Sequence, residues 1–167
     1  MKKVFLLMMV VALGAVTANA QWYAGGGLGF WNDSDAKTTV FEIIPEVGYN
    51  INSQWAVGTE LGFAYQKEGD YKTNAFTVSP YARYTYLNAG KVNLFVDGGF
   101  SLIKEKDVDA GFRAGLQPGV SIALTEKFSL VSKFGFLGYS DTAIYDGLNG
   151  FGLALTNNVS FGFFVNF

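Results

Sequence analysis

The sequence contains neither cysteine nor histidine among its 167 residues. Without cysteine, disulfide bonds cannot hold the fold, and thiol chemistry and cysteine-ligated metal sites are excluded. Without histidine, the Ser-His-acid arrangement of hydrolases is excluded, because that chemistry needs an imidazole to accept and return a proton. The two absences remove the common nucleophilic enzymes from consideration.

Charged residues are also sparse, at 16% of the chain, and the 14 acidic residues outnumber the 12 basic ones. This balance argues against nucleic acid as a partner, since such a partner requires a basic surface. Half of the residues are hydrophobic, yet beyond residue 20 no apolar stretch approaches the roughly 20 residues of a membrane-spanning helix. A helical membrane protein is therefore excluded, and the apolar side chains have to be organised in another way.

Residues 1–20 have the pattern of a secretory signal peptide. Lys2 and Lys3 precede an apolar run from Val4 to Val16, and the small residues of Ala18-Asn19-Ala20 follow it. The run is too short to serve as a spanning anchor. We expect cleavage after Ala20, so that residues 21–167 form one domain.

The rest of the chain alternates between unlike side chains with a period of two residues, which indicates β-strands. We expect eight strands, at Gln21–Asn32, Thr39–Tyr49, Trp55–Gln66, Ala75–Leu87, Val92–Leu102, Gly111–Leu124, Phe128–Tyr139 and Phe151–Phe167. Longer polar loops at Asp33–Thr38, Lys67–Asn74, Ile103–Ala110 and Ser140–Gly150 alternate with short turns at Asn50–Gln54, Asn88–Lys91 and Thr125–Lys127. Such alternation is typical of barrels with loops outside the cell and turns in the periplasm. The predicted fold is all-β, an eight-stranded antiparallel up-and-down transmembrane β-barrel.

The two faces of these strands differ in character. One phase is apolar and aromatic, and in the seventh strand it runs through Phe128, Leu130, Phe134 and Phe136. The other phase is rich in glycine and holds every charge of the expected strands, namely Glu42, Glu46, Glu60, Arg83, Asp97, Arg113 and Lys133. A soluble lipocalin-like barrel would place the apolar phase inside. A solvated surface gains nothing from glycine, whereas a narrow barrel interior needs small residues beside its few large polar ones. We therefore expect the apolar phase to face lipid.

Aromatic residues gather near the strand ends of the apolar phase, where interfacial girdles are expected. The girdle residues of tyrosine and tryptophan type are Trp22, Tyr49, Trp55, Tyr65, Tyr84 and Tyr86, and Phe136 is expected in the girdle near the loops. Three prolines, Pro45, Pro80 and Pro118, fall within the strands. Because proline lacks an N–H donor, we expect bulges or weak pairing at these positions.

The C-terminal strand alternates up to a final phenylalanine, through Val159, Phe161, Phe163, Val165 and Phe167. With the segments 79–84 and 127–130, it resembles the small outer-membrane barrels similar to outer-membrane proteins A and X, the outer membrane protein β-barrel domain. The resemblance covers the chain after the signal peptide. It implies a monomer in the outer membrane of a Gram-negative bacterium, in contact with lipid and lipopolysaccharide. It also implies escort by periplasmic chaperones and recognition of the strand ending at Phe167 by the barrel-assembly machinery.

The charges of the glycine-rich phase are the candidate functional residues. Buried charges are costly unless they are paired, so a lumen network that fills and locks the barrel is the favoured interpretation. A proton or ion path, or a site for a hard cation, remains as an alternative. The paired acids Asp33 with Asp35 and Asp107 with Asp109 are a second possible cation site, although turn residues are often acidic.

The sequence thus predicts a non-enzymatic outer-membrane barrel with a structural or surface-interaction role. No catalytic residue, metal site, cofactor or nucleic-acid partner is expected. The carboxylates of Glu42 and Glu46 could in principle perform acid/base chemistry, but membership of the lumen network is the simpler interpretation. The alternative function is a narrow porin-like channel for ions or small solutes.

Overall fold

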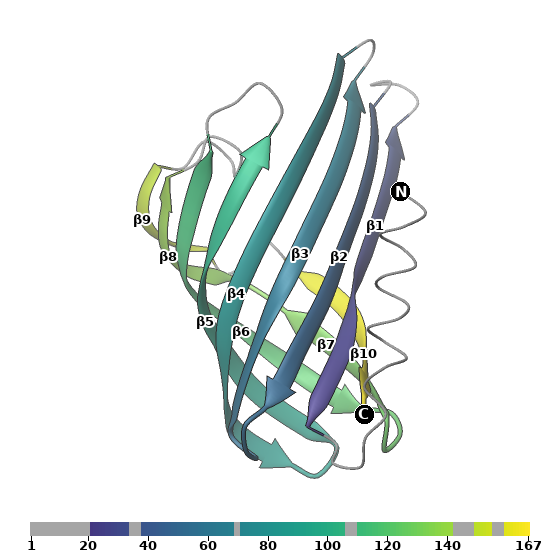
Figure 1. Ribbon diagram of the computed structural model, residues 1–167, viewed down its shortest axis with the longest axis vertical. Coiled ribbons are helices and arrows are strands. Elements are labelled where there is room, and N and C mark those ends of the chain that lie inside the picture. Colours follow the sequence, from purple (N-terminus) through teal and green to yellow (C-terminus); the bar gives the residue numbers. More distant parts are fainter. Residues whose placement is uncertain (1–20, 34–37, 69–70, 106–109, 142–148, 155–158) are drawn as a thin grey trace.

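The computed structural model describes residues 21–33, 38–68, 71–105, 110–141, 149–154 and 159–167. The expected signal peptide and Asp35, Asp107 and Asp109 lie outside this part of the chain. The described residues form the strands β1 (Trp22–Asp33), β2 (Thr38–Asn50), β3 (Trp55–Glu68), β4 (Tyr71–Ala89), β5 (Val92–Glu105), β6 (Gly111–Ala123), β7 (Phe128–Lys133), β8 (Phe136–Asp141), β9 (Asn149–Ala154) and β10 (Ser160–Asn166) (Figure 1). They contain no helix long and apolar enough to cross a membrane.

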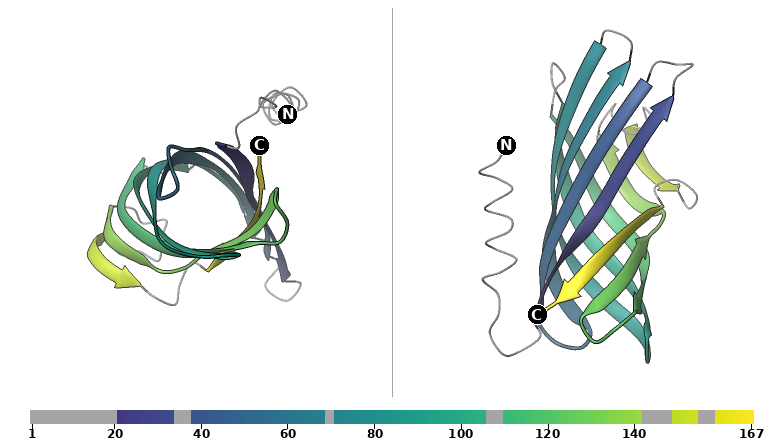
Figure 2. Two further views of the ribbon diagram at one scale, coloured as in Figure 1. Left: turned by 90° about the horizontal axis from the view of Figure 1, so that it is seen from below. Right: turned by 90° about the vertical axis from the view of Figure 1, so that its right-hand side faces the viewer.

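Eight of the strands close into a barrel in which every neighbouring pair is antiparallel. From β1 to β7 each strand pairs with the next along the chain, and β10 pairs with both β7 and β1 to close the ring (Figure 2). The two additional strands extend from β6, because β8 pairs with β6 and β9 pairs with β8. The expected eight-stranded antiparallel barrel is confirmed, with two strands more than expected.

The additional strands arise because the two last expected strands are each divided. In the seventh, a bulge at Gly135, where φ is +68°, separates β7 from β8. The bulge shifts the pairing with β6 by one residue, from Gly119 opposite Lys133 to Leu116 opposite Leu137. A one-residue shift reverses the faces of a strand. The expectation that Phe136 faces lipid in the girdle is therefore wrong: its ring lies in the lumen against Arg113, with 3.5 Å between the guanidinium carbon and the ring centroid.

The strands at the loop end are longer than expected. The expected loop at Lys67–Asn74 consists largely of strand, since β3 reaches Glu68 and β4 begins at Tyr71. The hairpins β1–β2 and β3–β4 consequently rise above the rest of the wall (Figure 1). The polar residues of this segment predict a loop, but the exposed end of a strand is polar as well, so the sequence does not distinguish the two.

Each proline coincides with an interruption of strand pairing. Pro45 falls in a gap of the β2–β3 register, between the pairs at Ile43 and Glu46. Pro80 falls in a gap of the β4–β5 register, between Val78 and Tyr81. Pro118 lies between the part of β6 that pairs with β8 and the part that pairs with β7. The expected weak pairing is confirmed, and its physical cause is the missing N–H donor.

The lumen is filled by aromatic rings that lie over glycines of the neighbouring strand. The cross-strand pairs are Tyr23 with Gly48, Tyr81 with Gly58, Phe95 with Gly119 and Phe164 with Gly25. A Cβ added at any of these four glycines would meet the facing ring at a distance that real Cβ atoms do not show. The glycines of the charged phase therefore supply the space in which the rings pack.

The opposite face of the wall is apolar and exposed. Leu28, Leu61, Phe63, Phe161 and Phe163 are among its large side chains with no cover from the barrel itself. In a transmembrane barrel this face meets the acyl chains of the bilayer. The side chains expected in the girdle lie on this face too. Trp22 packs against Tyr49 with 5.1 Å between ring centroids, Trp55 packs against Tyr84 at 4.8 Å, Tyr86 is exposed and Tyr65 is half-buried.

Candidate functional site

Five charged side chains from five strands meet in the middle of the lumen. The strands are β2, β3, β4, β5 and β7, and the residues are Glu46, Glu60, Arg83, Asp97 and Lys133. The sheet register fixes their common height, because Glu46 lies opposite Glu60 and Arg83 lies opposite Asp97. Four of the five are 9% exposed or less, and Glu60 is the more accessible member.

Arg83 is held on its edge by carboxylates and on its faces by rings. Its Nε donates to Asp97 Oδ1 at 2.7 Å and its Nη2 donates to Asp97 Oδ2 at 2.8 Å. The same Nη2 donates to Glu46 Oε1 at 3.1 Å. The guanidinium carbon lies 4.0 Å from the centroid of the Phe95 ring and 5.2 Å from that of Tyr81. Bidentate pairing and ring stacking both depend on the planar guanidinium, which lysine could not replace.

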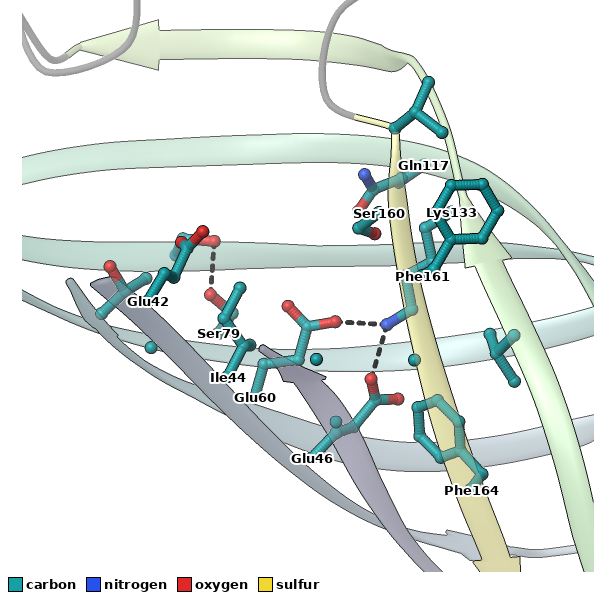
Figure 3. A pocket seen from close by; sticks show the side chains of 18 of the residues that line it. Glu42, Ile44, Glu46, Glu60, Ser79, Gln117, Lys133, Ser160, Phe161 and Phe164 are labelled. Atoms are coloured by element: carbon teal, nitrogen blue, oxygen red, sulfur yellow. Dashed lines mark hydrogen bonds and ion pairs between the residues drawn. The ribbon is translucent and has the colours of Figure 1, made fainter. Parts of the chain in front are cut away.

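Lys133 is surrounded by three carboxylates. Its Nζ donates to Glu46 Oε2 at 2.8 Å and to Glu60, and it lies 3.2 Å from Asp97 Oδ2. Figure 3 shows the ammonium group between the carboxylates of Glu46 and Glu60. The ion pairs thus link both cations to Glu46 and to Asp97, so the five charges form one connected network.

Two tyrosines complete the network, and the sequence analysis missed both. The Tyr81 hydroxyl donates to Glu46, and the Tyr23 and Tyr81 hydroxyl oxygens lie 2.6 Å apart. Both tyrosines occur at the alternate strand positions that otherwise hold glycine and charged residues, and this is the feature of the sequence that could have identified them. We call these seven residues the lumen plug: Tyr23, Glu46, Glu60, Tyr81, Arg83, Asp97 and Lys133.

The remaining two predicted network residues lie outside the lumen plug. Glu42 and Arg113 line the lumen nearer the loops. The guanidinium of Arg113 stacks on Phe136. In the described part of the chain, no three acidic side chains are arranged so as to hold a metal ion. The carboxylates of the plug are occupied by cations of the protein itself.

The lumen plug separates two chambers. The loop-end chamber has a volume of about 360 Å³ and is lined by Glu42, Glu46, Glu60, Arg113 and Lys133 among others (Figure 3). The turn-end chamber has a volume of about 470 Å³, and Arg83 and Tyr23 form part of its wall. Val131 and Phe164 border both chambers. The plug is therefore a partition across the lumen built from side chains alone.

The predicted assembly signal lies on the strand that closes the barrel. Val159, Phe161 and Phe163 are exposed, and Val159 and Phe161 also border the loop-end chamber. Val165 pairs with Ala24 of β1, and the Phe167 amide donates to the Trp22 carbonyl at 2.9 Å. These contacts place the C-terminal residues beside the first strand of the barrel.

Comparison with known proteins gives a consistent assignment. The structure is similar to that of Ail from Yersinia pestis, with a TM-score of 0.54 and 13% identity over 89% of this chain and all of that one. It is also similar to the N-terminal barrel domain of OprF from Pseudomonas aeruginosa, with a TM-score of 0.50 and 16% identity over 90% of this chain and all of that one. At such identities the likeness shows the fold alone. No curated protein sequence matches. The family model described as the outer membrane protein beta-barrel domain matches residues 4–167, and the chain belongs to that family.

Proposed function

We propose that this protein is a non-enzymatic, non-conducting barrel in the outer membrane of a Gram-negative bacterium, with a structural or surface-interaction role. The observation that supports the proposal best is the lumen plug. It joins Glu46, Arg83, Asp97 and Lys133 by ion pairs between 2.7 and 3.2 Å across the middle of the barrel. An ion could pass only if these pairs separated, and separation would leave buried charges without partners, which is strongly unfavourable.

The proposal is tested by recording currents from the purified barrel in a planar lipid bilayer. We expect no steady unitary currents from the wild-type protein. The double variant Arg83→Ala with Asp97→Ala removes three ion pairs of the plug, Arg83–Asp97, Arg83–Glu46 and Lys133–Asp97, together with the bulk of both side chains. It should therefore conduct, which would show that the assay detects an open lumen. Glu42→Gln, which changes a charge outside the plug, serves as the matched control and should stay silent.

The second candidate function is a narrow channel for ions or small solutes. It is favoured by the two chambers, because side chains alone, those of the plug with Val131 and Phe164, separate them. Clear unitary currents from the wild-type protein, altered by Arg83→Ala or Glu60→Ala, would support the channel and refute the non-conducting barrel.

The absence of catalysis is also part of the proposal. Histidine is lacking throughout the sequence, and the carboxylates of the plug are paired with cations rather than left available as a base. The mass of lipid A extracted from cells with and without the protein should be identical. A shift by an acyl chain or a phosphate would reveal a lipid-modifying enzyme.

The partners proposed for the barrel follow from its exposed faces and its C-terminal strand. Its apolar face is suited to outer-membrane lipid and lipopolysaccharide, and a monomer suffices because the ring of strands closes within one chain. The barrel-assembly machinery is the proposed reader of Phe167. Phe167→Ala should slow the appearance of heat-modifiable, folded protein in cells, whereas Phe161→Ala should have a smaller effect.

A further inference from the structure

Six polar side chains around the turn-end chamber have no hydrogen-bond partners in the described part of the chain, unlike those of the lumen plug. Amide and hydroxyl side chains from six different strands form a ring around it: Asn50, Asn88, Asn93, Ser121, Ser129 and Asn166. None of these six side chains forms a hydrogen bond with another described residue. The Oδ1 atom of Asn93 is buried and also lacks a partner in the described part of the chain. The protein thus leaves a ring of donors and acceptors unused around an open volume.

The electrostatic character of this chamber is neutral. Arg83 is the one charged side chain among the described residues that line it. The guanidinium of Arg83 is paired with Asp97 and Glu46, so its charge is already compensated. A charged ligand would find no counter-ion here, and an uncharged polar ligand would lose little solvation on entry.

The inner end of the chamber is closed by apolar side chains. Phe95, Val131 and Phe164 close the chamber there, and because each is 4% exposed or less they leave the polar ring as its main contact surface. Ligand sites contain a few convergent polar groups, typically in 300–1,000 Å³, and the chamber has about 470 Å³. Asparagine amides both donate and accept hydrogen bonds, as do the hydroxyls of a sugar, so the polar ring of the chamber matches an uncharged carbohydrate.

We propose that the turn-end chamber binds an uncharged carbohydrate, which enters from the side of the short turns. That side is expected to face the periplasm. The proposal is independent of whether the lumen plug blocks conduction, because the ligand occupies only the space on one side of the plug.

The direct test is a titration with di-N-acetylchitobiose, a neutral disaccharide, followed by NMR of the side-chain amides. The barrel should be held in a phosphocholine detergent, since detergents with sugar headgroups would compete. Saturable shifts of the Asn93 amide are expected. Asn93→Ala should weaken binding about tenfold, or about 1.4 kcal/mol, while Asn74→Ala, an exposed asparagine at the other end of β4, should leave affinity unchanged.

The thermal unfolding transition of each variant is measured as a control for correct folding. Asn88→Ala, at the exposed end of β4, is a second variant for use if Asn93→Ala does not fold. Co-sedimentation with insoluble chitin, released by the disaccharide, would show that the chamber takes the end of a glycan strand. Binding of the disaccharide without sedimentation would show that it takes a free saccharide. No saturable binding, or equal weakening by Asn74→Ala, would overturn the proposal and leave the chamber a hydrated mouth.

Discussion

Each of the four lumen glycines paired with an aromatic residue leaves room for one aromatic ring from a neighbouring strand. An ideal Cβ on Gly119 would lie 2.6 Å from Cε2 of Phe95 and 2.9 Å from the carbonyl oxygen of Ser132. The ring cannot move away freely, because Phe95 is 1% exposed and stacks on Arg83. The Phe95 ring therefore packs over Gly119 and on the guanidinium of Arg83 at the same time, so a side chain added at Gly119 would disturb the plug.

Gly119→Ala should destabilise the barrel by about 1–3 kcal/mol, the usual cost of overpacking a filled core. The measurement is urea-induced unfolding from lipid vesicles, followed by tryptophan fluorescence. Gly152→Ala is the matched control, because no atom lies within 4 Å of its added Cβ, and it should change stability by less than about 0.5 kcal/mol. Equal effects of the two variants would contradict the packing argument.

A second prediction at this scale concerns Lys133. Lys133→Met keeps much of the side-chain volume but leaves three carboxylates around one cation, so the free energy of unfolding should fall by about 3–5 kcal/mol. Lys67→Met removes an exposed lysine and should cost about 0.5 kcal/mol or less. Unfolding in urea again measures the difference. If Lys133→Met were as stable as Lys67→Met, the plug would not contribute to holding the barrel.

At the scale of elements, the bulge at Gly135 decides which residues face lipid. After the bulge Phe136 points into the lumen, and Leu137 and Tyr139 are 38% and 46% exposed on the outer side. Alanine at Gly135 would have to adopt a φ of +68°, which L-residues with a Cβ adopt only at a cost. The glycine therefore stabilises the change of register.

The lack of native cysteine allows this register to be tested with single introduced cysteines. A spin label on Leu137→Cys should be accessible to oxygen, which concentrates in the bilayer, whereas a label on Phe136→Cys should be shielded. Phe134→Cys, on the lipid side before the bulge, provides the reference for an exposed site. Higher oxygen accessibility at position 136 than at 137 would show that the strand continues without a bulge.

The sequence could predict the barrel and the height of its charges, but not this bulge. Alternation identifies strands and their faces, so sorting by phase sufficed to direct Glu46 and Lys133 to the same side of the wall. In Phe134-Gly135-Phe136, however, both phenylalanines fit one continuous alternation, and the extra residue is visible only in the pairing with β6. Alternation also puts Tyr81 in the phase of Arg83, but its hydrogen bond to Glu46 joins β4 to β2 across the lumen and is visible only in the structure.

At the scale of the whole molecule, the barrel is inverted relative to a soluble protein. Its interior holds ion pairs and glycines, and its exterior holds leucine, phenylalanine and valine. The bilayer supplies the apolar environment that a soluble protein builds within its own core. Stability should consequently depend on the depth in the membrane at which an outward-facing side chain is changed.

Leu61→Arg should therefore destabilise the barrel by about 2–4 kcal/mol, because Leu61 follows Glu60 of the central plug and its outward side chain lies near mid-depth. Val92→Arg, also outward but at the turn end of β5, should cost only about 0–1 kcal/mol. Urea unfolding from lipid vesicles measures both. In a soluble barrel these two exposed positions would tolerate arginine equally, so a clear difference between them shows that the apolar face is immersed in lipid, and equal costs would refute it.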